Sequence, residues 1–153
     1  MTYNALRTGR HSAAGQVYHI TTVTKNRVPV FSELDAGRLL VRELMTVQAE
    51  GLAETLCYVV MPDHLHWLLA LQGGGSLATL MQRVKGRSAH RISRLFWQAG
   101  FYDHAVRQDE DLRATARYLV ANPLRAGLVG GLGDYPLWDA AWLGAGDSTP
   151  LSC

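Results

Sequence analysis

The pattern of apolar and polar positions along this chain predicts four strands and three helices. Short runs rich in β-branched, aromatic and leucine residues are typical of strands, whereas apolar residues three and four apart mark one face of a helix. Glycine and proline separate these runs: Gly51 ends the first helical pattern, Pro62 turns the chain between two strands, and the glycines at 73–75 precede the second helix. The strands are predicted over 17–24, 52–61, 64–71 and 101–106, and the helices over 34–49, 77–95 and 109–121.

The order of these elements predicts the fold class. The first six follow the β-α-β-β-α-β order of a split βαβ, ferredoxin-like arrangement, which is an α+β fold. We therefore expect a four-stranded antiparallel sheet with two helices on one face and the third helix as a C-terminal addition. Residues 1–143 should form a single domain that begins with a flexible arm at 1–16, and residues 144–153 should form a disordered tail.

The composition is that of a soluble globular protein and excludes several classes. Apolar residues make up 48% of the 153 residues and charged residues 18%. No apolar run approaches the ~20 residues of a membrane helix, and the N-terminus lacks the pattern of a signal peptide. The two cysteines, Cys57 and Cys153, predict neither a disulfide framework nor a zinc site. We expect a cytoplasmic protein with no membrane partner.

The net charge of +2 conceals two basic segments. The first 30 residues carry four basic residues and no acidic one, residues 83–94 carry five more without an acid, and elsewhere acids outnumber bases by thirteen to six. An uninterrupted basic stripe on a helix is either a solvated face or a surface that contacts phosphates, to which the forked guanidinium group is suited. The candidate phosphate-binding residues are Lys25, Arg27, Arg83, Lys85, Arg87, Arg91 and Arg94.

His64 and His66 are the sharpest candidates for chemistry. Side chains alternate across a sheet, so both imidazoles point to one face of the predicted strand while Leu65 and Trp67 face the helices. Two imidazoles placed in this way can hold one divalent metal ion, although such a pair can equally be two half-exposed strand residues. His19 is interpreted as a structural histidine that could neighbour this pair across the sheet.

Tyr118 and Asn122 form a second candidate pair. They are four residues apart, so they share one helical face beside the apolar stripe of the third predicted helix. The alternative is that the tyrosine flanks a core and the asparagine only ends a helix before Pro123.

Together these residues resemble the HUH single-tyrosine transposases, and especially their REP-associated branch. Residues 61–67 (MPDHLHW) resemble the family's histidine, hydrophobic, histidine motif, and residues 118–129 (YLVANPLRAGLV) resemble its catalytic-tyrosine segment. Further similar pieces follow in the family's order at 18–22, 26–31, 81–87 and 97–104. In one departure, Trp138 is followed by Asp139-Ala140, where family members often have two serines.

This resemblance implies an enzyme that nicks and rejoins single-stranded DNA at hairpins or palindromic repeats. It implies a Mg²⁺ or Mn²⁺ ion held by His64 and His66, with Asn122 as third ligand where insertion-sequence relatives usually have glutamine. Tyr118 would attack phosphorus, form a covalent 5′-phosphotyrosine and release a 3′-hydroxyl. The basic residues listed above would contact the DNA, and the branch favours a monomer over a homodimer.

Two other functions stay open at this point. A ferredoxin-like sheet also serves as a non-catalytic platform for single-stranded nucleic acid, but such a protein would need neither the histidine pair nor a partnered tyrosine. A metal-dependent hydrolase with a water nucleophile would leave a free 5′-phosphate, but no general base is evident near the histidines.

Overall fold

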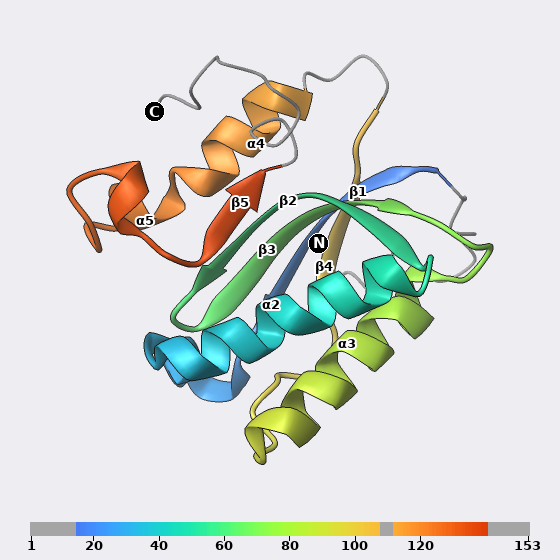
Figure 1. Ribbon diagram of the computed structural model, residues 1–153, viewed down its shortest axis with the longest axis horizontal. Coiled ribbons are helices and arrows are strands. Elements are labelled where there is room, and N and C mark those ends of the chain that lie inside the picture. The colour runs from blue at the N-terminus through green and yellow to red at the C-terminus, as the bar shows by residue number, and fades with distance from the viewer. Residues whose placement is uncertain (1–14, 108–111, 141–153) are drawn as a thin grey trace.

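Five antiparallel strands form one sheet in the order β4-β1-β3-β2-β5, with helices on both faces (Figure 1). The computed structural model describes residues 15–107 and 112–140. Three predicted segments lie partly or wholly outside these described residues: most of the arm, the start of the third helix, and the tail. The strands are β1 (Val17–Val23), β2 (Ala53–Met61), β3 (His64–Leu71), β4 (Tyr102–Ala105) and β5 (Trp138–Ala140). The helices are α2 (Leu34–Ala49), α3 (Leu77–Ile92), α4 (Leu112–Val120) and α5 (Asn122–Arg125), with 3₁₀ turns at Lys25–Arg27, Val30–Ser32 and Leu132–Asp134.

The first six elements have the predicted ferredoxin-like arrangement. β2 and β3 form a hairpin that turns at Pro62 and Asp63, and β1 lies between β3 and β4. The order β4-β1-β3-β2 of these four strands is that of a split βαβ fold. The predicted fold class is therefore confirmed.

A fifth strand extends the predicted four-stranded sheet at the edge of β2. β5 pairs antiparallel with β2, with Ala140 opposite Cys57. The Tyr135 hydroxyl donates a hydrogen bond to the carbonyl oxygen of Val60 at 2.5 Å and so fixes the segment before β5 to the sheet. Three residues after a proline are too few to show an alternating pattern, which is why this strand was not predicted.

α2 and α3 pack on one face of the sheet and form the main core with it. Leu65 and Trp67 point from β3 into this core and are fully buried, as strand alternation predicted. The indole nitrogen of Trp67 donates to the hydroxyl of Thr55 at 3.0 Å, so its polar atom is satisfied within the apolar layer. In Figure 1 the two helices lie together on the same side of the sheet.

α4 and α5 lie on the opposite side of the sheet from α2 (Figure 1). Leu119 and Val120 of α4 pack with Cys57 and Leu68 of the sheet in a second, smaller core. Because α4 is short, this core covers only part of that face, and the histidine side chains of β3 remain half-buried rather than fully buried.

One helix ends earlier than predicted. α3 ends at Ile92 rather than at Leu95, because Ser93 adopts a left-handed backbone conformation with φ 63°. Arg94 therefore lies beyond the helix and does not share the helical face expected for it. Among the described residues, no helix is long and apolar enough to cross a membrane.

Candidate active site

Three histidines form a cluster on the sheet face opposite α2 and α3. β3 places His64 and His66 there, with their ring centroids 4.9 Å apart. β1 lies alongside with Thr21 opposite His66, and His19 lies two residues earlier on the same face. The Nδ1 atom of His66 is 3.0 Å from Nε2 of His19 and 3.1 Å from the hydroxyl oxygen of Thr21, so β1 holds this ring in place.

The histidines at the centre of this cluster are uncharged at neutral pH. Burial and the neighbouring His64, His19 and Arg125 lower the pKa of His66 to about 3. Burial and the nearby His104 lower the pKa of His19 to about 4. A neutral imidazole keeps a nitrogen lone pair, which is the form that a metal ligand requires.

Asp63 orients the second imidazole. Its Oδ1 atom is 2.7 Å from Nδ1 of His64, and its Oδ2 atom is 3.5 Å from a guanidinium nitrogen of Arg27. A carboxylate in this position favours the tautomer with the proton on Nδ1 and the lone pair on Nε2. Asn26 and Arg27 have left-handed φ angles of 57° and 56°, a conformation that brings the arginine back toward Asp63.

These donor atoms fit a Mg²⁺ or Mn²⁺ ion. Both His64 and His66 use Nδ1 for contacts within the protein, so Nε2 of each is available to a metal. Mn²⁺ accepts imidazole together with oxygen ligands, while Mg²⁺ prefers oxygen and commonly keeps several waters and phosphate oxygens in its shell. No third histidine, cysteine or carboxylate completes a metal-binding group in the described part of the chain, so further ligands would be an amide, water or DNA.

Tyr118 lies on α4, on the same side of the sheet as the histidines. Leu119 packs against Leu68, which follows His66 by two residues on β3 and therefore shares its face. Tyr118 itself points away from this core and is 66% exposed. Its predicted position beside the apolar stripe, and not within it, is confirmed.

Arg125 connects Tyr118 with Asn122. Its guanidinium carbon lies 3.9 Å from the centroid of the tyrosine ring, and one guanidinium nitrogen donates a hydrogen bond to Oδ1 of Asn122. α4 ends at Val120 and Asn122 begins α5, so the two candidates belong to consecutive helices that this arginine joins. Because Oδ1 of Asn122 faces a cation here, the role of Asn122 as a metal ligand stays a prediction.

His19, Thr21 and Arg125 belong to this site although no motif assigned them to it. His19 was predicted as a possible neighbour across the sheet, and Thr21 could have been found in the same way, because the predicted fold places the first strand beside the third and alternation puts both side chains on one face. Arg125 gave no such signal, since its contact with Tyr118 depends on the chain bending between α4 and α5.

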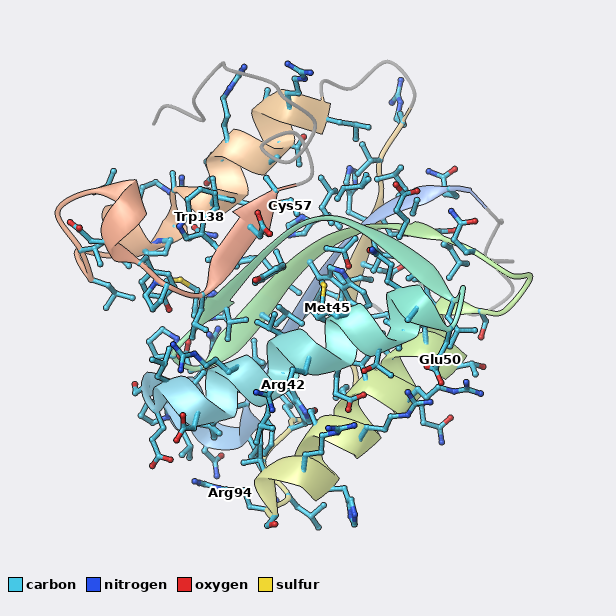
Figure 2. All side chains as sticks on the ribbon, in the orientation of Figure 1. Arg42, Met45, Glu50, Cys57, Arg94 and Trp138 are labelled. Carbon is cyan, nitrogen blue, oxygen red and sulfur yellow. The ribbon has the colours of Figure 1, made fainter. Side chains whose placement is uncertain are left out.

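α2 supplies acidic partners to the basic residues of α3. Arg87 donates two hydrogen bonds to the Glu50 carboxylate, at 2.8 and 3.0 Å. Arg91 places Nε 2.5 Å from Oε1 of Glu43, whose side chain is fully buried. The basic stripe is uninterrupted along α3, but these two arginines have acidic partners from another helix. Figure 2 shows Glu50 at the end of α2.

Lys85 is also held within the fold. Its Nζ atom donates to the carbonyl oxygens of Gln98 and Gly100 at 2.7 and 2.6 Å, so it fixes the segment between α3 and β4. Burial lowers its pKa to about 8. DNA contact stays a prediction for Lys85, Arg87 and Arg91. Each of these side chains would first have to leave its partner within the protein.

Lys25 and Arg94 come from separate basic segments but line one cavity. The backbone amide of Lys25 donates to the carbonyl oxygen of Phe96 at 2.7 Å and holds the two loops together. Neither Arg83 nor Arg94 makes an ion pair within residues 15–107 and 112–140. The cavity has a volume of about 130 Å³ and is lined by Lys25, Asn26, Val28, Arg94, Leu95 and Phe96.

Alanine substitutions of Arg91 and Arg83 should distinguish an arginine that stabilises the fold from one that contacts DNA. Arg91→Ala leaves the buried Glu43 carboxylate without its nearest cation and should lower the free energy of unfolding by about 1–3 kcal/mol in urea titration. Arg83→Ala, on the same helix but exposed, should leave stability unchanged and weaken binding of single-stranded DNA. Equal stability of the two variants would contradict the structural role of Arg91.

The chain shows similarity to known transposases in sequence and fold. The family described as "Transposase IS200 like" matches residues 12–122. The REP-associated tyrosine transposase of Escherichia coli (strain K12) is 27% identical over 101 residues, which cover 65% of this chain and 61% of that relative. The chain therefore spans about three fifths of the length of that curated relative.

A solved structure has the same fold. The structure of a REP-associated tyrosine transposase bound to a REP hairpin superposes with a TM-score of 0.79 at 23% sequence identity. The superposition covers 94% of this chain and 88% of that protein, so the likeness extends over nearly the whole chain.

Proposed function

This chain belongs to the IS200-like transposase family, and we propose that it is a metal-dependent enzyme that nicks and rejoins single-stranded DNA through a covalent tyrosine intermediate. One observation carries this proposal. Two histidines with available Nε2 atoms share a face of the sheet with a helix that presents an exposed tyrosine. A nucleic-acid platform without catalysis would not require this combination.

The side chains of the site have distinct roles in the proposed reaction. His64 and His66 bind the ion, and Asp63, Thr21 and His19 hold their rings in the required tautomer and orientation. When bound there, Mg²⁺ or Mn²⁺ supplies Lewis-acid polarisation of the scissile phosphate.

Tyr118 is the nucleophile in this proposal. Its phenol oxygen attacks phosphorus, a bond from that oxygen to phosphorus forms, and the bond from phosphorus to the 3′ oxygen breaks. The phenol proton passes to solvent, and the departing 3′ oxygen takes up a proton to become a hydroxyl. The phosphotyrosine keeps the phosphodiester linkage, so attack by a 3′-hydroxyl reverses the step without ATP.

Hairpins formed by palindromic repeats are the proposed substrate. The E. coli relative is a REP-associated transposase, and the structural relative is bound to a REP hairpin. Lys25, Arg83 and Arg94 are the predicted DNA-contacting residues whose side chains make neither an ion pair nor a hydrogen bond within the described ranges, and they are the first candidates for phosphate contacts. The histidines, Tyr118 and Arg125 lie on one face of a single chain, which supports action as a monomer.

End-labelled oligonucleotides test this function directly. The probe is a single-stranded oligonucleotide that carries a hairpin-forming palindromic repeat together with its flanks. With Mn²⁺ present, a 3′-end label should appear in a covalent protein adduct, whereas a 5′-end label should appear in a shorter free fragment that ends in a 3′-hydroxyl. Addition of EDTA should remove both products.

The same gels distinguish the alternative functions. A cut strand with a free 5′-phosphate and no adduct would indicate hydrolysis by water. Tight binding that is insensitive to EDTA, with no cleavage of any hairpin, would indicate a binding module. Either result contradicts the proposed function.

A further inference from the structure

Arg125 occupies the position between the two parts of the proposed active site. Its guanidinium lies over the ring of Tyr118 and donates to Asn122, both described above. Its charge also contributes to the lowered pKa of His66, so its field reaches the histidine cluster on β3. No other cation in the described part of the chain contacts the proposed nucleophile.

Most of the hydrogen-bonding capacity of Arg125 is unused. A guanidinium group has five N–H donors in a planar fork, and the one hydrogen bond recorded for this side chain goes to the neutral amide of Asn122. Arg125 is exposed and takes part in no ion pair with a carboxylate within residues 15–107 and 112–140. By contrast, Arg87 and Arg91 have acidic partners.

We propose that Arg125 binds the phosphate that Tyr118 attacks, and that it exchanges the Asn122 side chain for this phosphate when DNA binds. The inference rests on the proposed function, because it assigns a residue to that reaction. The exchange is favourable since hydrogen bonds from a guanidinium to an anionic phosphate are stronger than those to a neutral amide, and two can form in parallel.

The place of Arg125 over the tyrosine ring explains why it suits the task. Its guanidinium carbon is 3.9 Å from the ring centroid, so its unused N–H groups lie near the phenol and can reach the oxygens of a phosphate there. The non-bridging oxygens gain negative charge as the phenol oxygen attacks, and a fixed cation stabilises that charge. Unlike a lysine, the guanidinium cannot lose its charge near the metal site.

If Arg125 had a purely structural role, its removal would lower the melting temperature. Its contacts lie on the exposed surface, where a cation over an aromatic ring adds little to the stability of the fold. Removing the side chain should therefore leave the melting temperature nearly unchanged, and any loss of activity would arise in the reaction itself.

The test measures adduct formation in a single turnover at saturating DNA, with the labelled probe described above. Arg125→Gln should slow adduct formation about 100-fold while the dissociation constant for the probe changes less than about threefold. Arg125→Lys keeps the charge without the fork and should recover part of the rate. Arg42→Gln, which removes an exposed arginine from α2 on the opposite face of the sheet, is the matched control and should react like the wild type (Figure 2).

A second probe carries an uncharged methylphosphonate at the position where the wild-type protein cuts. Wild type should react slowly with it, and Arg125→Gln should be no slower than wild type, because the charge that Arg125 contacts is missing. Two results would overturn the inference and leave the proposed function intact. In one, Arg125→Gln slows adduct formation on this probe by the same factor as on natural DNA. In the other, Arg125→Gln reacts with natural DNA at the wild-type rate. Absence of any adduct with wild-type protein would instead overturn both.

Discussion

Replacing Tyr118 with phenylalanine is expected to abolish the covalent protein–DNA adduct. The substitution removes only the hydroxyl, from a side chain that is 66% exposed and outside both cores, so the fold should not change. Without the phenol oxygen no bond to phosphorus can form, and adduct formation should fall by at least about 1,000-fold. Denaturing gels with the 3′-labelled probe measure this, and a filter-binding assay in EDTA should show unchanged affinity for DNA.

Tyr102→Phe is the matched control for that experiment. Tyr102 is the other strongly exposed tyrosine among the described residues, and on β4 it lies opposite Thr21, near the histidine cluster. This variant should form the adduct at the wild-type rate. If Tyr102→Phe lost the adduct while Tyr118→Phe kept it, the nucleophile would be Tyr102 and the proposed role of α4 would be wrong.

Replacing His66 with alanine is expected to abolish metal-dependent cleavage. His66 lies at the centre of the cluster, and its Nε2 atom is one of the two imidazole nitrogens available to the ion. Loss of Lewis-acid activation should slow adduct formation by about 1,000-fold, which corresponds to ~4 kcal/mol of transition-state stabilisation. Calorimetric titration should show weakened Mn²⁺ binding in parallel.

His90→Ala serves as the control for His66→Ala. His90 is exposed on α3, beyond the opposite face of the sheet, and should affect neither metal binding nor cleavage. Unchanged stimulation by Mn²⁺ in His66→Ala would show that the ion binds elsewhere. A circular dichroism melt should accompany both variants, so that loss of activity is not confused with unfolding.

The histidine pair could be predicted from sequence because strand geometry is local. An alternating run of residues on β3 determines which side chains face the helices, and the buried Leu65 and Trp67 show that the pattern was interpreted correctly. The order of strands followed from the order of elements and the short hairpin connection. No comparable local rule predicts that Arg125 lies over Tyr118, because a bend between α4 and α5 determines it.

The partners of the basic residues could not be predicted from the spacing on α3 alone. Arg87 and Arg91 meet Glu50 and Glu43 only because α2 packs beside α3. A partial signal was present, since Glu43 directly precedes Leu44 on the apolar side of α2, where a carboxylate needs a cation to be buried. The predicted basic stripe was correct as a sequence pattern and incomplete as a description of the surface.

The short strands at the two borders of the sheet affect how copies of this protein can associate. β4 has four residues and β5 has three, so within the described residues each border exposes only a brief row of backbone hydrogen-bonding groups. Without β5, the nine-residue β2 would be a long template for strand addition by another chain. β5 therefore protects the protein against edge-to-edge aggregation, a property that matters if the proposed unpaired DNA substrate brings several copies close together.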